Sequence, residues 1–363
     1  MIAATQPVQR PQDAKLLVVD ALGRASHARR RDFVDFLRRG DLVIANNAAT
    51  LPASLRGRHR PTGGEIEVRL AGRRSLSAAD VECFSAIVFG AGDFRTPTER
   101  RPPPPALTPG DRLTLGPLRA TVTRLLDHPR LVSLHFDGCA DDIWAGIARH
   151  GRPLQYAHVR TPLALWDVWT VIAGPPVAFE PPSAGFVLDW QALARMRSRG
   201  VEFATITHAA GISSTGDEAL DARLPFDEAY EVPGTTAAAV ERARADGRRI
   251  VAIGTTVVRA LEHAADGHGH VRAGEGVATR RLDQASCLQI VDAILSGVHE
   301  PATSHYRLLR AFTAAETLRR ADEMMSAGEY RTHEFGDSVL IERSPSSFAC
   351  RDREPAFALD LSA

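Results

Sequence analysis

Residues 248–262, RRIVAIGTTVVRALE, contain the signal that decides the fold. The apolar run IVAI is followed by Gly254 and then by a predicted helix with Arg259 one turn from its start. A buried strand that leads directly into a helix is the building unit of α/β proteins. We expect Thr255 and Thr256 to cap this helix. Exposed N–H groups at the helix start suit a carboxylate or another anion, although an ordinary strand–helix junction has the same pattern.

Strands and helices alternate in this way through most of the chain outside residues 53–150. The alternation predicts an α/β domain with a largely parallel sheet, because helices are the usual connections between parallel strands. The expected strands are 15–20, 41–44, 201–207 and 250–253, and the expected helices are 190–199, 237–246 and 257–265. A further helix is expected where apolar residues recur at helical spacing, with a core-facing stripe of Cys287, Ile290, Val291, Ile294 and Leu295.

Residues 53–150 instead show alternating apolar and polar positions, which are typical of half-buried strands. The sequence DHPR at 127–130 predicts a hairpin turn within this region. We therefore predict an antiparallel, barrel-like β-domain at 53–150. It is inserted into a parallel-sheet α/β domain made of residues 1–52 and 151–345, and residues 346–363 form a carboxy-terminal tail.

Composition excludes several classes of function. The 363 residues carry 44 basic and 44 acidic side chains, so nucleic-acid binding would need a local basic patch. Lys15 is the only lysine, which excludes a phosphate-binding loop ending in GK[ST] and disfavours Schiff-base chemistry. The four cysteines form no CxxC pair and no HExxH motif occurs, so we expect no metal. No signal segment or long apolar run is present, and we expect a cytoplasmic protein without a membrane span.

Two loops are further candidates for a binding site. The segment EPPSAGF at 180–186 places Ser183, Ala184 and Gly185 where a flat ring could approach the backbone, although it could also be a linker. The segment THAAGISST begins where a predicted strand ends, with His208 and Gly211 at the usual location of α/β sites.

Two further polar residues lie near the carboxy-terminal end of the α/β region. His299 lies in the sequence HEP, after the predicted apolar helix. Asp337 lies between a glycine and the final predicted strand, where it could bind a ribose hydroxyl or cap a turn.

Taken in order, these segments resemble S-adenosylmethionine:tRNA ribosyltransferase-isomerase, the enzyme of queuosine biosynthesis. The block GTT-x-x-R-x-L-E is the most specific part of the resemblance. The family fold is an α/β domain with an inserted β-barrel, which agrees with the periodicity. The segments that carry the resemblance are 41–57, 62–68, 181–186, 200–207, 231–233, 248–262, 291–295 and 330–341.

The resemblance implies that S-adenosylmethionine donates its ribosyl carbons rather than its methyl group. A base removes a C5′ hydrogen beside the sulfonium, adenine leaves, and the aminomethyl group of a 7-deazaguanine in tRNA captures the opened sugar. Methionine departs as an epoxycyclopentane forms. The catalytic residues implied are Thr255, Thr256, Arg259, His299 and Asp337, and the substrate-binding residues are Asn46, Asn47, Ser183, Ala184, Gly185, His208, Gly211 and Gly254.

The chain also departs from the family pattern at polar positions, which indicates a divergent member. Family histidines are replaced by Val187 and Ala209, and Ala48 and Ala49 replace a Thr-Arg pair. Two alternatives therefore stay open beside tRNA modification. One is a related enzyme that acts on a small-molecule acceptor, and the other is a non-catalytic protein that binds a nucleoside or RNA.

Overall fold

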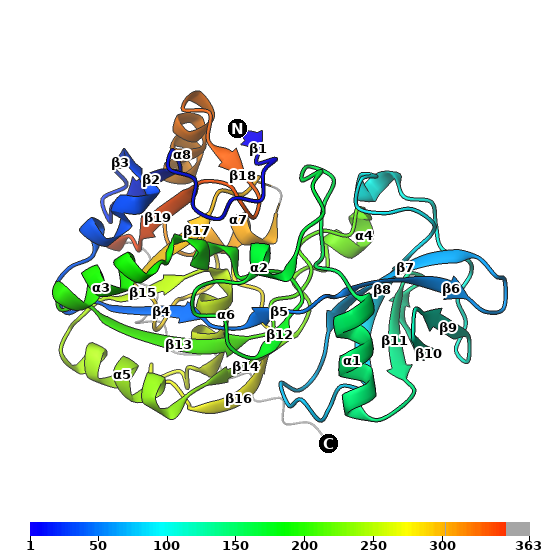
Figure 1. Cartoon of the computed structure of the whole chain (residues 1–363). Helices are drawn as coiled ribbons and strands as arrows, with labels where there is room; N and C mark the ends of the chain where they lie inside the picture. Colours follow the sequence, from blue (N-terminus) through cyan, green and yellow to red (C-terminus); the bar gives the residue numbers. More distant parts are fainter. Residues whose placement is uncertain (302, 346–363) are drawn as a thin grey trace, which may run out of the picture.

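A mixed β-sheet forms the centre of the larger lobe in the computed structural model, which describes residues 1–301 and 303–345 (Figure 1). The predicted tail at 346–363 lies outside the described residues. Within them, the sheet has nine strands. Their spatial order is β16 (Gly274–Ala278), β14 (Glu228–Val232), β13 (Glu202–His208), β4 (Leu42–Asn46), β15 (Ile250–Ile253), β17 (Ala293–Gly297), β19 (Ser338–Glu342), β2 (Lys15–Val19) and β3 (Ala25–Arg29).

Parallel pairing is confined to the middle of this sheet and to one outer pair. Strands β13, β4, β15 and β17 are parallel neighbours, and β2 runs parallel to β19. The pairs β13–β14, β14–β16, β17–β19 and β2–β3 are antiparallel. The parallel prediction is therefore confirmed for the central strands, and antiparallel strands extend the sheet on both sides.

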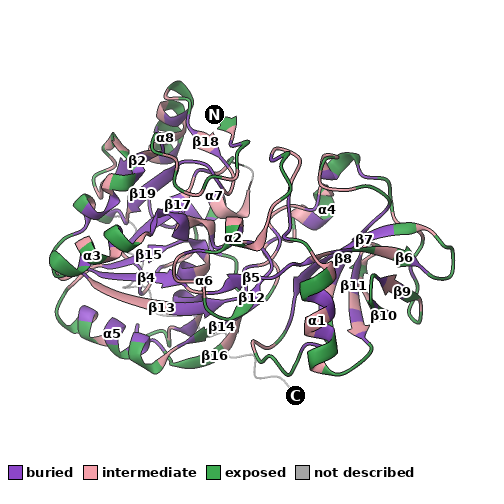
Figure 2. Ribbon diagram, in the orientation of Figure 1, coloured by how far each residue is buried: buried purple, intermediate pink, exposed green. Residues whose placement is uncertain are grey.

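Helices cover both faces of the sheet and form a three-layer arrangement. Alternate residues of each strand point to opposite faces, so Ile250 and Ala252 face one apolar cluster while Val251 and Ile253 face another. Figure 2 shows the sheet strands as the most deeply buried part of this lobe. The first cluster includes residues of α5 (Gly234–Ala245), α6 (Thr255–Ala264), α7 (Ser304–Leu309) and α8 (Ala315–Ala327), and the second those of η1 (Arg30–Phe36), η3 (Ser183–Val187) and α3 (Trp190–Ser198).

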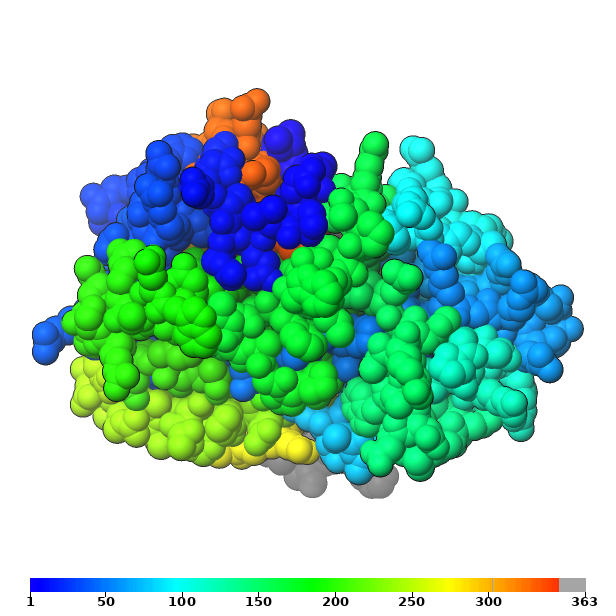
Figure 3. Space-filling view, viewed as in Figure 1, coloured from blue at the N-terminus to red at the C-terminus, as the bar shows by residue number. Residues whose placement is uncertain are grey.

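The second lobe is a closed antiparallel barrel, as predicted, and it protrudes from one side of the molecule (Figure 3). The predicted turn at 127–130 lies between β10 and β11. Helix α1 (Ala140–His150), which the alternation did not reveal, packs Ile143 and Ile147 into the apolar cluster that the barrel contributes to. The barrel strands in spatial order are β10 (Leu118–His128), β11 (Leu131–Phe136), β8 (Cys83–Phe89), β7 (Glu65–Gly72), β6 (Ser54–His59) and β9 (Arg112–Leu115).

The two chain crossings between the lobes lie side by side. Ser54 and Arg152 exchange both of their backbone hydrogen bonds, at 2.9 and 3.0 Å. The shorter elements are β1 (Ile2–Ala3) paired with β18 (Arg331–Thr332), β5 (Ala49–Thr50) paired with β12 (Pro176–Ala178), α2 (Leu165–Val168), α4 (Glu218–Asp221) and η2 (Thr98–Arg100).

The helix expected around residues 287–295 is wrong. Cys287 and Ile290 lie in turns and coil, and the segment continues into strand β17. Ile294 and Leu295 are both fully buried but face opposite clusters. A strand buried on both faces is apolar at nearly every position, so its sequence can imitate helical spacing. His299 therefore follows the carboxyl end of a strand.

Candidate functional site

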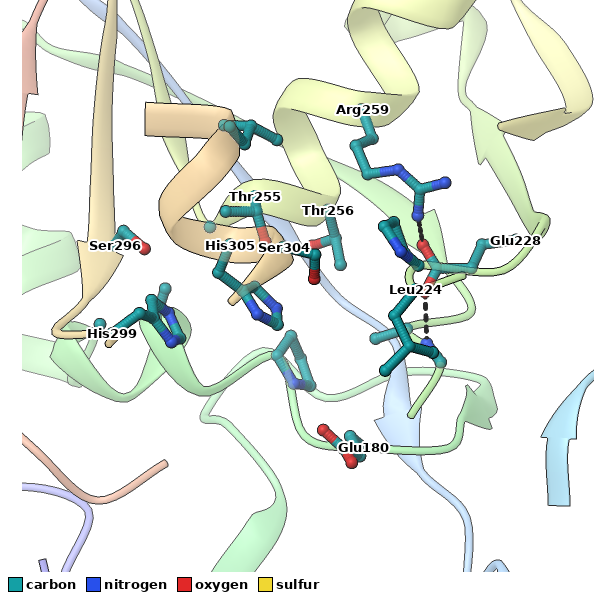
Figure 4. A pocket seen from close by; sticks show the side chains of 18 of the residues that line it. Glu180, Leu224, Glu228, Thr255, Thr256, Arg259, Ser296, His299, Ser304 and His305 are labelled. Carbon is teal, nitrogen blue, oxygen red and sulfur yellow. Dashed lines mark hydrogen bonds and ion pairs between the residues drawn. The ribbon is translucent and has the colours of Figure 1, made fainter. Parts of the chain in front are cut away.

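A cavity of about 320 Å³ lies beyond the carboxyl ends of β13, β15 and β17 (Figure 4). This edge is where ligands bind in open α/β sheets, because the loops that follow parallel strands meet there. The cavity is lined by residues from the strand-end loops, from the 180–184 segment, from α7 and from the 281–283 segment. They include Glu180, Ser183, Ala184, Gly211, Leu224, Glu228, Gly254, Thr255, Thr256, Arg259, Arg281, Asp283, Ser296, His299, Ser304, His305 and Arg307.

Gly254 forms the tight junction between β15 and α6. Its φ of +96° is a backbone conformation that only glycine adopts without strain. A Cβ built on Gly254 would lie 3.4 Å from the Cβ of Ala184, so the two loops pack closely here. The expectation that Thr255 and Thr256 cap the helix is wrong, because Gly254 is the N-cap and α6 has no side-chain cap. The first N–H groups of α6 are thus left without a side-chain acceptor.

Arg259 lines the cavity but already has acceptors within the protein. Its guanidinium forms an ion pair with Glu228 and donates to the carbonyl oxygens of Phe226 at 3.2 Å and Ala278 at 2.9 Å. Glu228 also accepts from the N–H of Gly211 at 2.6 Å. The guanidinium of Arg259 is therefore already paired with the carboxylate of Glu228.

His299 and His305 form a stacked pair on one wall of the cavity, with ring centroids 4.4 Å apart. Burial lowers the pKa of His299 well below its usual value, and the neighbouring His305 and His333 lower it further. Burial likewise lowers the pKa of His305 to about 4, with a smaller effect from Arg259. Both imidazoles are therefore neutral near pH 7 and can accept hydrogen bonds.

Glu180 is a buried carboxylate on another part of the cavity wall (Figure 4). Its Oε1 accepts hydrogen bonds from the Tyr156 hydroxyl and from the N–H of Ser213 at 3.0 Å. Burial raises the pKa of Glu180 to about 7, and the negative charge of Glu334 contributes to the rise. This carboxyl group therefore gains and loses its proton near neutral pH.

Several residues assigned to the site from the sequence do not line the cavity. Gly185 packs against Thr170, just behind Ala184. Asn46 holds the backbone of His208 through two hydrogen bonds of 2.9 and 3.0 Å, and Asn47 accepts from the hydroxyl of Thr207 at 2.8 Å. These side chains support the strand ends behind the cavity.

His208 is fully buried, and neither ring nitrogen has a hydrogen-bond partner among the described residues. Its Nε2 lies 3.6 Å from a carboxylate oxygen of Glu228. Burial lowers its pKa well below the usual value, with a further contribution from Arg259. The neutral His208 thus packs beneath the Arg259–Glu228 pair and does not reach the cavity.

Asp337 organises the chain away from the cavity rather than lining it. Its carboxylate accepts from the N–H groups of Lys15 and Arg331, both at 2.8 Å, and the side chain of Arg331 lies 3.4 Å away. The glycine turn at Gly336 directs the carboxylate toward the junction of β2 and β18. A role for Asp337 near a reacting centre is therefore not supported.

The cavity also contains residues that the sequence analysis did not select. Glu180 belongs to the EPPSAGF segment and could have been found as the only acidic residue of a candidate loop. Glu228 lies on β14 and His305 and Arg307 lie on α7, and the fold brings these elements to one cavity. Among the described residues, no group of three or more His, Cys, Asp or Glu side chains could hold a metal ion. None of the helices described is long and apolar enough to cross a membrane.

The chain is similar to known proteins over nearly its whole length. Two relatives named S-adenosylmethionine:tRNA ribosyltransferase-isomerase, from Sorangium cellulosum and Thermus thermophilus, are each 33% identical to the chain. The alignments cover 94% and 91% of this chain, and 95% and 93% of the relatives. A crystal structure of S-adenosylmethionine tRNA ribosyltransferase from Thermotoga maritima aligns with 22% identity and a TM-score of 0.49, covering 93% of this chain and 96% of that one. Residues 1–341 match the family described as "Queuosine biosynthesis protein", and the chain belongs to that family.

Proposed function

We propose that this protein transfers and isomerises the ribosyl moiety of S-adenosylmethionine onto 7-aminomethyl-7-deazaguanine in tRNA, with release of adenine and methionine. The observation that carries the proposal is the cavity at the β15–α6 junction, in a chain that matches its family from residue 1 to residue 341. The most specific sequence block of the resemblance, GTTVVRALE, contributes Gly254, Thr255, Thr256 and Arg259 to the wall of that cavity.

The start of α6 is suited to the carboxylate of the donor's methionine part. Gly254 leaves the first N–H groups of the helix uncapped, and the hydroxyl groups of Thr255 and Thr256 lie beside them. Because the partial positive charge of a helix is concentrated at this end, a carboxylate is favoured there. Ser183 and Ala184 close the same part of the cavity.

The histidine pair is suited to the adenine. His299 and His305 present neutral, flat rings to the cavity, and their nitrogens can exchange hydrogen bonds with the edge of a purine. With the carboxylate at α6 and the adenine near the imidazoles, the ribose and the sulfonium lie within the same cavity. The sulfonium is then inside a cavity whose wall carries the carboxylates of Glu180 and Glu228.

A tRNA acceptor is favoured over a free amine by the charges on the cavity wall. Arg281 and Arg307 line the cavity and are exposed, and such side chains can contact phosphate groups. These two arginines supply a local positive surface in a chain whose net charge is +0.

The test is a reconstituted reaction with three acceptors. The full chain is incubated with S-adenosylmethionine and tRNA bearing 7-aminomethyl-7-deazaguanine, the same tRNA bearing guanine, or the free modified base. We expect adenine and methionine release, and the mass of the epoxycyclopentane product in the tRNA, only with the first acceptor. Turnover with the free base alone would support the small-molecule alternative, and binding of the donor without turnover would support a non-catalytic protein.

A further inference from the structure

We propose that Glu180 is the base that removes the C5′ proton of S-adenosylmethionine in this cavity, an inference that rests on the function proposed above. The argument depends on which carboxylates the cavity offers. Three carboxylate side chains line it in the described part of the chain, namely Glu180, Glu228 and Asp283.

Glu228 and Asp283 are less suitable than Glu180. Both oxygens of Glu228 are engaged, one by Gly211 and the other by the guanidinium of Arg259. Asp283 is exposed, and one of its oxygens accepts from Ala285 and Ser286. An exposed carboxylate is strongly solvated, which makes it a weak base toward a carbon acid.

Glu180 is buried and held in one orientation. The hydroxyl of Tyr156 and the N–H of Ser213 both donate to Oε1, and the side chain of Ser213 also hydrogen-bonds to the carboxyl group. These donors orient the carboxyl group, and we assign its other oxygen, Oε2, to the proton from the cavity. In the view of Figure 4, Glu180 lies on the opposite side of His305 from Thr255 and Thr256.

The surroundings of Glu180 tune its proton affinity for this task. Burial and the charge of Glu334 raise its pKa to about 7, close to the pH at which a general base works best. His299 has a pKa well below its usual value and so holds a proton poorly. The titratable and charged groups around Glu180 are Tyr156 and Glu334 behind it, His158 and His333 beside Glu334, and Glu228, Arg259, His299 and His305 around the cavity.

The proposed step balances without a further reactant. The C5′–H bond breaks and the proton forms an O–H bond with Oε2 of Glu180. The electron pair of the broken bond stays on C5′, where the adjacent positive sulfur stabilises it. Glu180 thereby becomes neutral, which its buried position favours.

Glu180→Gln is the first variant, because glutamine has the same shape and its Oε1 can still accept from Tyr156 and Ser213. We expect adenine release with donor and modified tRNA to fall by about 100-fold or more, the usual contribution of a general base. The dissociation constant for S-adenosylmethionine should change by less than about threefold, since the carboxylate acts in the chemical step. Glu231→Gln, which removes an exposed carboxylate on β14, serves as the matched control and should retain the wild-type rate.

Two neighbouring variants separate a chemical role from a structural one. In the wild-type protein, adenine release should rise with pH through about 7, because the step requires the carboxylate form. Glu334→Gln removes the neighbouring negative charge and should move this midpoint to lower pH. Tyr156→Phe removes a hydrogen bond that stabilises the carboxylate and should move the midpoint to higher pH.

The outcomes distinguish the two proposals. If the wild-type protein releases no adenine, the proposed function fails and the assignment of Glu180 fails with it. If the wild-type protein turns over while Glu180→Gln keeps its rate, or if the midpoint does not move in opposite directions in the two neighbouring variants, Glu180 is not the base and the proposed function stands.

Discussion

Glu67 in the barrel and Glu180 at the cavity are both buried glutamates, with side-chain environments of opposite electrostatic character. Burial alone raises the pKa of a carboxyl group, and in Glu67 the guanidinium groups of Arg69 and Arg101 overcome this effect and lower it. No guanidinium group offsets the effect of burial on Glu180. Burial and the negative charge of Glu334 together raise its pKa to about 7. The difference between the two glutamates is therefore the sign of the neighbouring charge.

The comparison separates a carboxylate that holds a lobe together from one that is available for chemistry. Glu67 accepts from Ser54 at 2.8 Å and from Arg69 at 2.9 Å, and it is ion-paired with Arg101. Its charge is fixed and its oxygens are engaged. Glu180 lines the cavity and has a pKa raised to about 7, and such a shifted pKa is typical of functional sites.

Glu67→Ala should have the largest effect on stability. Removing the carboxylate leaves Arg69 and Arg101 as buried cations without their main partner, which typically costs about 3–5 kcal/mol. Urea unfolding followed by the fluorescence of Trp144, which packs against the barrel cluster, would measure the loss. Glu65→Ala on the same strand removes an exposed glutamate and is the control. Equal midpoints for the two variants would contradict the prediction.

Arg259→Ala should have the next largest effect, because it leaves Glu228 buried beside His208 without its guanidinium partner. We expect the free energy of unfolding to fall by roughly 3 kcal/mol, the lower end of the range for a broken buried pair, since Glu228 keeps the N–H of Gly211 and borders the cavity. The double variant Arg259→Ala/Glu228→Gln should recover part of this loss. If the double variant is as unstable as the sum of the single variants, the pair is not energetically coupled.

Glu180→Gln should change the free energy of unfolding by a smaller amount and in the opposite direction, because this substitution stabilises the fold at high pH. The pKa of Glu180 is raised in the folded protein, so its contribution to stability is fully present below its unfolded pKa and is lost as the pH rises through about 7. The variant should therefore resemble the wild type near pH 4 and exceed its free energy of unfolding by roughly 2 kcal/mol at pH 8. Denaturant titrations at both pH values would show it, and a constant difference between them would refute the assigned pKa.

The elements with a clear hydrophobic periodicity were predictable from the sequence. The pairings between side chains distant in the sequence were not. The run IVAI before Gly254 located β15 and α6, and the alternation within 53–150 located the barrel. Arg259 was expected in the site from its sequence block, and its pairing with Glu228, which lies 31 residues earlier on β14, was not predictable. The pairing of Arg101 with Glu67, which lies 34 residues earlier in the chain, was equally hidden.

The resemblance to a known family supplied the site's general position, and the structure shows which of the implied residues line the cavity. Asp337 and His208 were placed in the site as polar residues near strand ends, but burial and backbone hydrogen bonds assign them to the scaffold. Glu180 lies in the candidate loop EPPSAGF, but nothing in that segment indicates its raised pKa. Its pKa depends on Glu334 and Tyr156, which the sequence separates from it by many residues.

The hydrogen-bonded crossing of Ser54 and Arg152 has a consequence for how such a molecule can be built or rebuilt. Because the chain leaves the sheet and returns to it at neighbouring positions, the barrel occupies the place of a short loop. A short peptide joining these two points would leave the order of the nine sheet strands unchanged. Protein engineers could therefore exchange the inserted lobe for another domain at this attachment without changing the order of the sheet strands.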